Sequence, residues 1–330
     1  MNNNASPEKI LNLARSFMES RILLTGAELN LFTMLTPASL SAQEIARKIG
    51  ADLRALTVLL DALTALGFLV KRIDTYQCSP ILSPFLTVGS PNSILPIILH
   101  MAHLWGRWSD LRSVVQGSSS KEKPASSEDA SELLDFIEAM HVVAAPIAPR
   151  IVSVVKPGSS KDLLDVGGAS GTYTLAFLQA VPEMKATLFD RPKVIGMARK
   201  RLGQAGVLDR VTLVAGDFYK DELPTGHDLA FVSAIIHQNS PDQNLALFGK
   251  IFRSLNPSGR IVIRDHVMSV DRTRPVDGAI FAVNMVLGTT GGRTYTYEEI
   301  KDGLEEAGFT GIRLLQAGEH MDGLVEAFKT

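Results

Sequence analysis

The sequence predicts an α/β protein in which a doubly wound, mainly parallel sheet follows a mostly helical N-terminal domain. From residue 161 onward, short apolar runs alternate with amphipathic stretches of helical periodicity, as in parallel sheets with helices on both faces. A glycine-rich turn joins the first of these runs to a helix. Residues 1–116, in contrast, have almost entirely helical periodicity. We therefore expect a helical domain over 1–116, a linker loop and connecting helix over 117–155, and the sheet domain over 156–330.

The composition is that of a globular protein and excludes several functional classes. Apolar residues make up 45% of the 330 residues and charged residues 21%, with a net charge of −2. This charge gives no overall attraction to nucleic acid or anionic membrane. Cys78 is the only cysteine, which rules out an internal disulfide. With no secretory pattern at the N-terminus and no apolar run of about 20 residues, we expect a cytoplasmic protein without a membrane span.

The helical domain contains the layout of a winged helix. Ser41 and Glu44 form a predicted capping box that begins a short helix ending near Gly50. Asp52 begins a second helix, and residues 67–79 follow as a small hairpin. DNA recognition by the second helix would need exposed cations or amides, but Arg54 is its only cation. Because this helix is apolar over most of its circumference, we expect it to be buried in packing or dimerisation.

The connecting region has two parts. Residues 116–132, "QGSSSKEKPASSEDASE", are typical of an exposed loop. Residues 133–155 form a helical stretch interrupted by Pro146 and Pro149. The sheet strands predicted after it are "DLLDVGG", "KATLFD", "VTLVAGD", "HDLAFVSAIIH" and "RIVIRDHV", with "GLVEAFK" near the C-terminus as a further strand.

The first strands of the sheet end in residues suited to a nucleoside. The turn Asp165-Val-Gly-Gly-Ala-Ser-Gly171 lacks the glycine spacing of a dinucleotide fingerprint and the Lys of a P-loop. It still allows a ligand to approach the backbone closely. Asp190 ends the second strand, where a carboxylate suits ribose hydroxyls. Asp217 ends the third and could accept a hydrogen bond from an adenine amino group, with Phe218 over the ring. The alternative for any single acid is a helix N-cap.

The motifs "LDVGGASG", "LFD-RP", "AGDFY", "IIHQNSPDQN", "NPSGRIVIRD" and "GGRTYTYEEI" occur in an order and spacing that resemble the S-adenosylmethionine-dependent O-methyltransferases. The resemblance is to the two-domain family of plant caffeate-type and bacterial polyketide- or carotenoid-type enzymes. It implies a class I, Rossmann-like methyltransferase fold, an S-adenosyl-L-methionine cofactor, and a homodimer formed through a winged-helix dimerisation domain. The residues that it assigns to the cofactor are Gly167, Ala169, Gly171, Asp190, Asp217 and Phe218.

The same resemblance assigns catalysis to His237 as general base, with Asp265 beside it. Methyl transfer needs the acceptor oxygen to lose a proton, and a phenol of pKa about 10 is a poor nucleophile when protonated. An imidazole of pKa about 6.5 is mostly neutral in the cytosol and can take this proton. Asp265 could fix its tautomer. The alternation of a strand predicts that the neighbouring His266 points to the opposite face.

Met140 matches a methionine that in the family lies between cofactor and substrate, although core filling is the alternative. The stretch 279–292 is implied to form part of an apolar acceptor pocket, unless it is simply a core helix. The pocket candidates are Phe136, Met140, Phe281, Asn284 and Met285. They imply a small, hydrophobic, hydroxylated acceptor and neither nucleic acid nor membrane as partner. No ligand spacing in the sequence suggests a metal.

The sequence departs from the family pattern at two places. Gln238 and Asn239 stand where members often have Asp-Trp, and Thr294 stands where plant enzymes have a second acid. Three other functions therefore remain open: a C- or N-methyltransferase of the same fold, a cofactor-binding winged-helix regulator, and an enzyme that does not methylate.

Overall fold

The computed structural model describes residues 6–118 and 130–330, with the side chains of 130–132 also outside the description. Part of the predicted linker loop falls in this gap. The chain divides into two compact units, Met1–Gly106 and Arg107–Thr330. The expected boundary between residues 116 and 117 stays a prediction.

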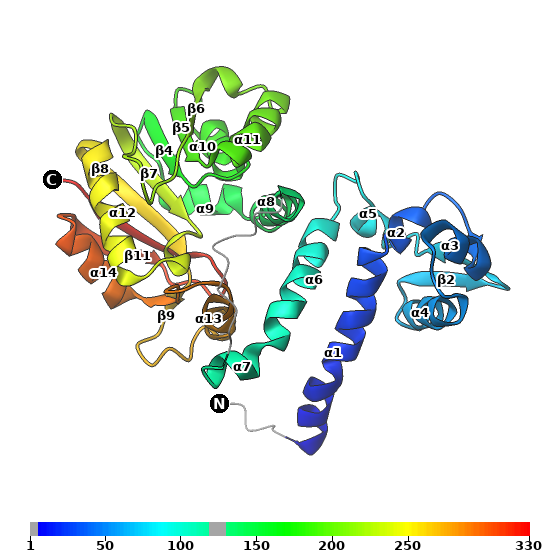
Figure 1. Ribbon diagram of the computed structural model, residues 1–330. Helices are drawn as coiled ribbons and strands as arrows, with labels where there is room; N and C mark the ends of the chain where they lie inside the picture. The colour runs from blue at the N-terminus through cyan, green and yellow to red at the C-terminus, as the bar shows by residue number, and fades with distance from the viewer. Residues whose placement is uncertain (1–5, 119–129) are drawn as a thin grey trace. The chain divides into compact units, whose positions relative to one another are not determined.

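The first unit contains the predicted helix-turn-helix and hairpin (Figure 1). Ser41 and Glu44 form both halves of the capping box, and Gly50 ends the helix with a φ of +68°. Asp52 caps the second helix. The hairpin joins a three-stranded sheet in the order β1-β3-β2. The elements are α1 (Pro7–Glu28), α2 (Leu31–Met34), β1 (Leu40–Ser41), α3 (Ala42–Ile49), α4 (Leu53–Ala65), β2 (Leu69–Arg72), β3 (Thr75–Cys78), α5 (Ser83–Leu86) and α6 (Leu95–Ser109).

Two helices of this unit expose apolar side chains in the single chain. Helix α4 buries Leu56, Leu60 and Leu63 within the chain and exposes Leu53 and Val58, so its expected burial by packing is met on one face and burial by dimerisation stays a prediction. Helix α1 exposes a larger set, each member more than half accessible: Ile10, Leu11, Leu13, Phe17 and Met18. Such apolar surface is typical of a face that pairs with another protein surface.

The second unit contains the predicted doubly wound sheet. Its seven strands have the order β11-β12-β8-β7-β4-β5-β6. Strands β4 to β8 are parallel, and β12 joins β8 antiparallel. The strands are β4 (Asp162–Val166), β5 (Lys185–Asp190), β6 (Val211–Ala215), β7 (His227–Ser233), β8 (Leu255–Asp265), β11 (Thr310–Gln316) and β12 (Gly323–Phe328), with the short pair β9 (Val267–Met268) and β10 (Tyr295–Thr296) apart from the sheet. The fold class is therefore confirmed, and β11 is an edge strand that the sequence did not indicate.

Helices cover both faces of this sheet (Figure 1). One core lies under α9, α10 and α11, and the other lies under α12 and α14. The helical elements are α7 (Leu111–Val115), α8 (Ala130–Ala144), α9 (Ala148–Val155), α10 (Thr172–Ala180), α11 (Pro192–Gln204), η1 (Leu208–Arg210), η2 (Ile236–Gln238), α12 (Pro241–Ser254), α13 (Val276–Gly288) and α14 (Tyr297–Glu306). The strand order reverses between β4 and β7, which places a crevice for ligands at their carboxyl ends.

Within the described residues, no individual helix combines the length and apolarity needed to cross a membrane. Only the bent pair Leu133–Ala144 and Ala148–Val155 meets both criteria together, by length and composition alone.

The capping box of α3 gives a stability prediction. Replacing Ser41 by Ala removes the oxygen that accepts from the Glu44 amide at 3.3 Å, and should lower the free energy of unfolding by about 1 kcal/mol. Ser20→Ala is the control, because the Ser20 hydroxyl only bonds a carbonyl on the exposed face of α1, and should change stability by less than about 0.5 kcal/mol. Urea titration at a fixed protein concentration measures both, and equal effects would contradict the capping role.

Candidate active site

The glycine turn after β4 presents bare backbone at the carboxyl edge of the sheet. Gly167 has a φ of +68°, and a Cβ there would lie 2.6 Å from Ile235 Cδ1. A Cβ on Gly168 would lie 2.8 Å from the Asp165 carboxyl carbon. Neither position has room for a side chain, because the turn packs directly on the residues below it. Glycine is therefore required at both positions by the packing of the turn on Ile235 and Asp165.

Asp190, at the end of β5, holds this turn from one side. Its Oδ2 accepts from the Ala169 amide at 2.7 Å and its Oδ1 from the Arg191 amide at 2.6 Å. Burial raises the pKa of the Asp190 carboxyl, although these two amides oppose the shift. The structure thus brings Ala169 and Asp190 together as the sequence predicts, while Gly171 lies against Leu202 of α11.

The segment after β6 supplies an aromatic neighbour to the same turn. Asp217 Oδ1 accepts from the Tyr219 amide at 3.0 Å, and Asp217 Oδ2 lies 3.4 Å from Lys220 Nζ. The rings of Phe218 and Tyr219 pack with centroids 4.6 Å apart. Phe218 Cε1 is only 3.9 Å from the position of a Cβ on Gly167. A bare turn, a carboxylate and an aromatic ring at one edge fit a nucleoside cofactor.

The second half of the site joins the ends of β7 and β8. His237 lies in the turn η2 after β7, and Asp265 is the last residue of β8. Both carboxylate oxygens lie 2.9 Å from His237 Nδ1, and Oδ2 also accepts from the His237 amide at 3.4 Å. The side chains are buried, with Asp265 only 1% exposed. The predicted pair is therefore a buried imidazole–carboxylate contact.

Charge interactions keep Asp265 ionised in this buried position. Burial alone would raise its pKa, but the His237 ring and the His266 amide outweigh burial, and the pKa of Asp265 is lowered. The His266 amide donates to Asp265 Oδ1 at 2.8 Å. An ionised carboxylate on Nδ1 holds the proton on that nitrogen and leaves Nε2 as the acceptor.

Phe281 of α13 lies between the two histidines. Its ring meets His237 edge-on, with centroids 4.8 Å apart, and lies 5.1 Å from the His266 ring. His266 follows the last residue of β8, and its expected orientation to the opposite face stays a prediction. Burial lowers the pKa of His266.

The other pocket candidates are distributed over two helices. On α13, Asn284 Oδ1 accepts from Trp108 Nε1 at 3.2 Å, and Met285 is buried. On α8, Phe136 is 37% exposed and Met140 is partly buried. Helix α8 packs near the cofactor turn, because its Leu133 and Ile137 form a cluster with Val194 and Ala169. Contact of the pocket candidates Phe136, Met140, Asn284 and Met285 with a substrate stays a prediction.

The loop before β10 presses on the turn that carries His237. A Cβ on Gly292 would lie 2.6 Å from the His237 carbonyl oxygen and 2.9 Å from that of Gln238. Glycine is required there by this close approach. Thr294, two residues later, is buried and supplies no carboxylate. Glu299, one of the acids on the helix that follows, forms ion pairs with Arg272 and Arg293 and accepts a hydrogen bond from the Thr296 amide at the start of α14.

Sequence reasoning missed the polar side chains that support the His237 turn. Asn239 is fully buried and contacts Tyr219 and Asn244, and Tyr295 bonds its carbonyl. A run of polar residues directly after an apolar strand was the available signal. This pattern indicates a departure from the family at these positions, whereas the structure shows a buried hydrogen-bond network. In the part of the chain that the structure describes, no group of three His, Cys, Asp or Glu residues could hold a metal.

Comparison with known families agrees with this geometry. An O-methyltransferase domain model matches residues 115–310, and an O-methyltransferase dimerisation domain model matches residues 11–87. The chain belongs to the O-methyltransferase family. This methyltransferase is 28% identical over 98% of its length to the 3-hydroxy-5-methyl-1-naphthoate 3-O-methyltransferase of Streptomyces sahachiroi, covering 95% of that protein. It is 29% identical over 93% of its length to the tetracenomycin polyketide synthesis 8-O-methyl transferase TcmO of Streptomyces glaucescens, covering 92% of it.

Solved structures share the fold of this methyltransferase over the whole chain. Human N-acetylserotonin methyltransferase in complex with SAM superposes with a TM-score of 0.82 at 24% identity, covering 100% of this chain and 99% of that one. PigF with SAH superposes with a TM-score of 0.86 at 24% identity, covering 98% of this chain and 100% of that one. The predicted family, fold class and methyltransferase activity are confirmed, and these comparisons support the predicted cofactor.

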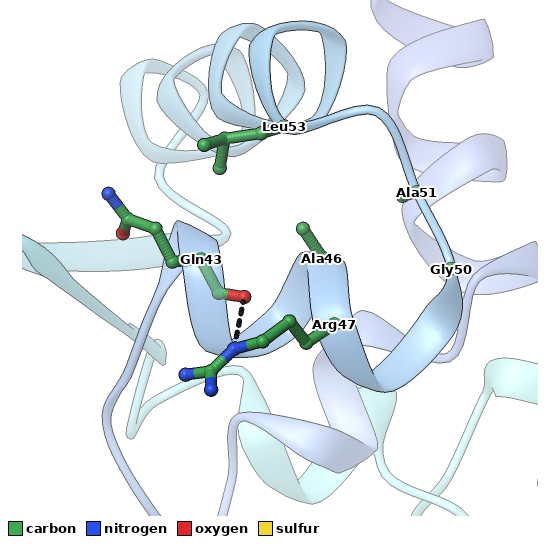
Figure 2. A pocket seen from close by; sticks show the side chains of 6 residues that line it. All are labelled: Gln43, Ala46, Arg47, Gly50, Ala51 and Leu53. Carbon is green, nitrogen blue, oxygen red and sulfur yellow. Dashed lines mark hydrogen bonds between the residues drawn. The ribbon is translucent and has the colours of Figure 1, made fainter.

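A hollow in the first unit carries no comparable chemistry. Figure 2 shows it between α3 and α4, lined by Gln43, Ala46, Arg47, Gly50, Ala51 and Leu53. Its one cation, Arg47, donates from Nε to the Gln43 carbonyl oxygen at 3.4 Å. None of the six residues is an acid, a thiol or an imidazole, so the hollow lacks a general base.

The buried Asp165 below the glycine turn gives a pH prediction. Burial raises its pKa from 3.8 to about 6, against a 2.6 Å hydrogen bond from Thr174 Oγ1. Because the folded chain then binds this proton more tightly than the unfolded chain, the contribution of Asp165 to the free energy of unfolding should fall as pH rises from about 4 to 6. This one group should contribute at most about 3 kcal/mol to that fall.

Denaturant titrations across that pH range measure this contribution. Asp165→Asn should remove the fall in the free energy of unfolding that Asp165 contributes as pH rises. Thr174→Val, which removes the bond that opposes the shift, should steepen it. A decline that neither substitution changes would show that Asp165 does not titrate there.

Proposed function

We propose that this protein is a homodimeric, S-adenosyl-L-methionine-dependent O-methyltransferase that uses His237 as general base. The methyl group would go to a hydroxyl of a small, hydrophobic, aromatic or polyketide-like acceptor. The observation that carries the proposal is the buried contact of His237 Nδ1 with both oxygens of Asp265. This contact leaves Nε2 as the nitrogen that can take a proton.

The cofactor would be held by the residues around the glycine turn. Gly167, Ala169 and Gly171 supply the backbone, and Asp190 supplies a carboxylate for ribose hydroxyls. Asp217 and Phe218 would receive the adenine. When bound, S-adenosylmethionine supplies an electrophilic methyl group on a sulfonium. Glycine at 167 allows the turn to pack closely on Ile235, because even a Cβ there would collide with that side chain.

The protein's own contribution to the reaction is proton removal and orientation. His237 would accept the proton of the acceptor hydroxyl on Nε2, and Asp265 would stabilise the imidazolium that forms. The edge contact with Phe281 restricts rotation of the His237 ring. A buried, oriented base of this kind raises the fraction of acceptor oxygen that is ready to attack.

The choice of acceptor is supported by the residues beside the base and by the relatives. Helix α13 places Phe281 against His237 and carries Asn284 as a polar group among apolar residues. Two relatives that match over most of the chain are named for a hydroxynaphthoate and a tetracenomycin polyketide. The first name gives a hydroxylated naphthoate and the second an O-methylated polyketide, and a hydroxylated aromatic acceptor suits an apolar pocket with few polar groups.

The dimer proposal is supported by the dimerisation domain match over residues 11–87 and by the exposed apolar face of α1. Sedimentation or light scattering of the full chain tests this part. A monomer at micromolar concentration would contradict it.

The general test is mass spectrometry of phenols and polyphenols incubated with the protein and S-adenosylmethionine. We expect the gain of one methyl group on oxygen, located by fragmentation. A methyl group on carbon or nitrogen would overturn the proposed reaction while leaving the family assignment intact.

His237→Asn gives a sharper prediction. Turnover of a phenol of pKa about 10 should fall by about 100-fold or more, because the proton has no acceptor. A nitro-substituted phenol that is already ionised at the assay pH needs no base, so its turnover by His237→Asn should fall much less. Initial rates with both acceptors measure the difference.

His320→Asn is the matched control for this substitution. His320 also contacts an aspartate, with Nδ1 2.5 Å from Asp277 Oδ2, but this pair is exposed at the surface. The control should retain turnover with both acceptors. Full turnover in His237→Asn would refute the base assignment.

Asp190→Ala tests the cofactor site without catalysis. Loss of the carboxylate should weaken binding of S-adenosylhomocysteine by about 10- to 100-fold, as expected for removal of a charged hydrogen-bond partner. Isothermal titration calorimetry measures the affinity. Asp74→Ala, in the turn of the first unit's hairpin, is the control and should bind normally. Unchanged affinity in Asp190→Ala would place the ribose elsewhere.

A further inference from the structure

A continuous chain of hydrogen bonds runs from the segment after β6 to the turn that carries His237. Tyr219 Oη donates to Asn239 Oδ1 at 2.5 Å. Asn239 Nδ2 donates to Asn244 Oδ1 at 2.9 Å, and Asn244 Nδ2 donates to the Ile236 carbonyl oxygen at 2.9 Å. These hydrogen bonds connect the segment after β6, Asn239, helix α12 and the turn η2 of the polypeptide. The three side chains therefore fix these segments relative to one another.

The two ends of this series of hydrogen bonds, Tyr219 and Ile236, lie beside the two halves of the candidate site. Tyr219 follows Phe218, the residue proposed to cover the adenine, and their rings pack together. Ile236 immediately precedes His237 within η2. The Ile236 oxygen also accepts from the Asn239 amide at 3.2 Å, which closes the turn. The chain therefore connects the cofactor side with the base.

The amides at its centre have no access to water. Asn239 is 0% and Asn244 4% exposed, so a lost partner could not be replaced by solvent. The Tyr219 ring is 48% exposed, and only its hydroxyl reaches inward. Burial of this hydroxyl, with the charge of Asp217, raises the pKa of Tyr219, so it stays protonated and donates at neutral pH.

We propose that Tyr219 and Asn239 are positioning residues that couple occupation of the cofactor site to the placement of His237. The proposal rests on the proposed role of His237 as base. A nucleoside packed on Phe218 would restrict Tyr219, and Tyr219 would in turn restrict the η2 turn through Asn239. Since small displacements of a catalytic group lower rates strongly, loss of this coupling reduces turnover more than cofactor affinity.

Tyr219→Phe is the test, because it removes one hydroxyl from a half-exposed ring and leaves the buried amides in place. Tyr297→Phe is the matched control. Its hydroxyl donates to the Ile312 carbonyl oxygen at 3.1 Å, between α14 and β11, with no link to the η2 turn. Hydrogen–deuterium exchange of residues 235–240 is followed with and without S-adenosylhomocysteine, and initial rates are measured with a phenolic acceptor.

We expect S-adenosylhomocysteine to slow exchange of residues 235–240 in the wild type and in Tyr297→Phe. In Tyr219→Phe it should still bind, but this protection should be lost, and kcat should fall by about tenfold or more. The proposal would be overturned if S-adenosylhomocysteine protected residues 235–240 of Tyr219→Phe as it does in the wild type, whether or not turnover fell. It would also be overturned if Tyr219→Phe changed only the affinity for the cofactor.

Failure of the proposed function gives a different pattern. If His237→Asn keeps full turnover, the base assignment is wrong, yet the exchange experiment still reports whether Tyr219 couples the two sites. If His237→Asn is inactive while Tyr219→Phe behaves as Tyr297→Phe, the base stands and the coupling is refuted.

Discussion

The active-site end of this fold depends on one buried carboxylate, that of Asp265. It accepts hydrogen bonds from the His237 ring, the His237 amide and the His266 amide. A buried carboxylate without partners would be neutral or would destabilise the fold. With these three donors it stays ionised, and it ties the turn after β7 to the end of β8. The pairing of Ser233 with Arg264 on these strands sets the register that brings the two ends together.

The glycine turn has few side chains of its own, so neighbouring residues must hold it in place. Asp190 holds it from β5 through the Ala169 amide, and Ile235 fills the space below Gly167. Ile235 lies two residues before His237. The same short segment therefore supports the glycine turn and carries His237. A substitution that moved Ile235 would disturb both, so the two halves of the site are not mechanically independent.

Much of this arrangement could be predicted from local sequence. The caps at Ser41 and Asp52 and the strands of the parallel sheet follow from short-range patterns, and both caps form as expected. Strand β11 could not be found this way, because its residues "TGIRLLQ" lie at the sheet edge and are largely exposed. Asn239 was missed because its partner Tyr219 is 20 residues away and meets it only after folding.

The two departures from the family pattern have different structural consequences. The absence of an acid at Thr294 leaves His237 with one carboxylate, and this suffices to hold the tautomer because both Asp265 oxygens face Nδ1. Asn239, which departs from the Asp-Trp expected from the resemblance, is held in its buried position by hydrogen bonds. A buried amide is stable only when each of its groups finds a partner, and the side chains of Tyr219 and Asn244 supply them. Substitution at 239 therefore brings further requirements at 219 and 244, and these three positions should vary together among close relatives.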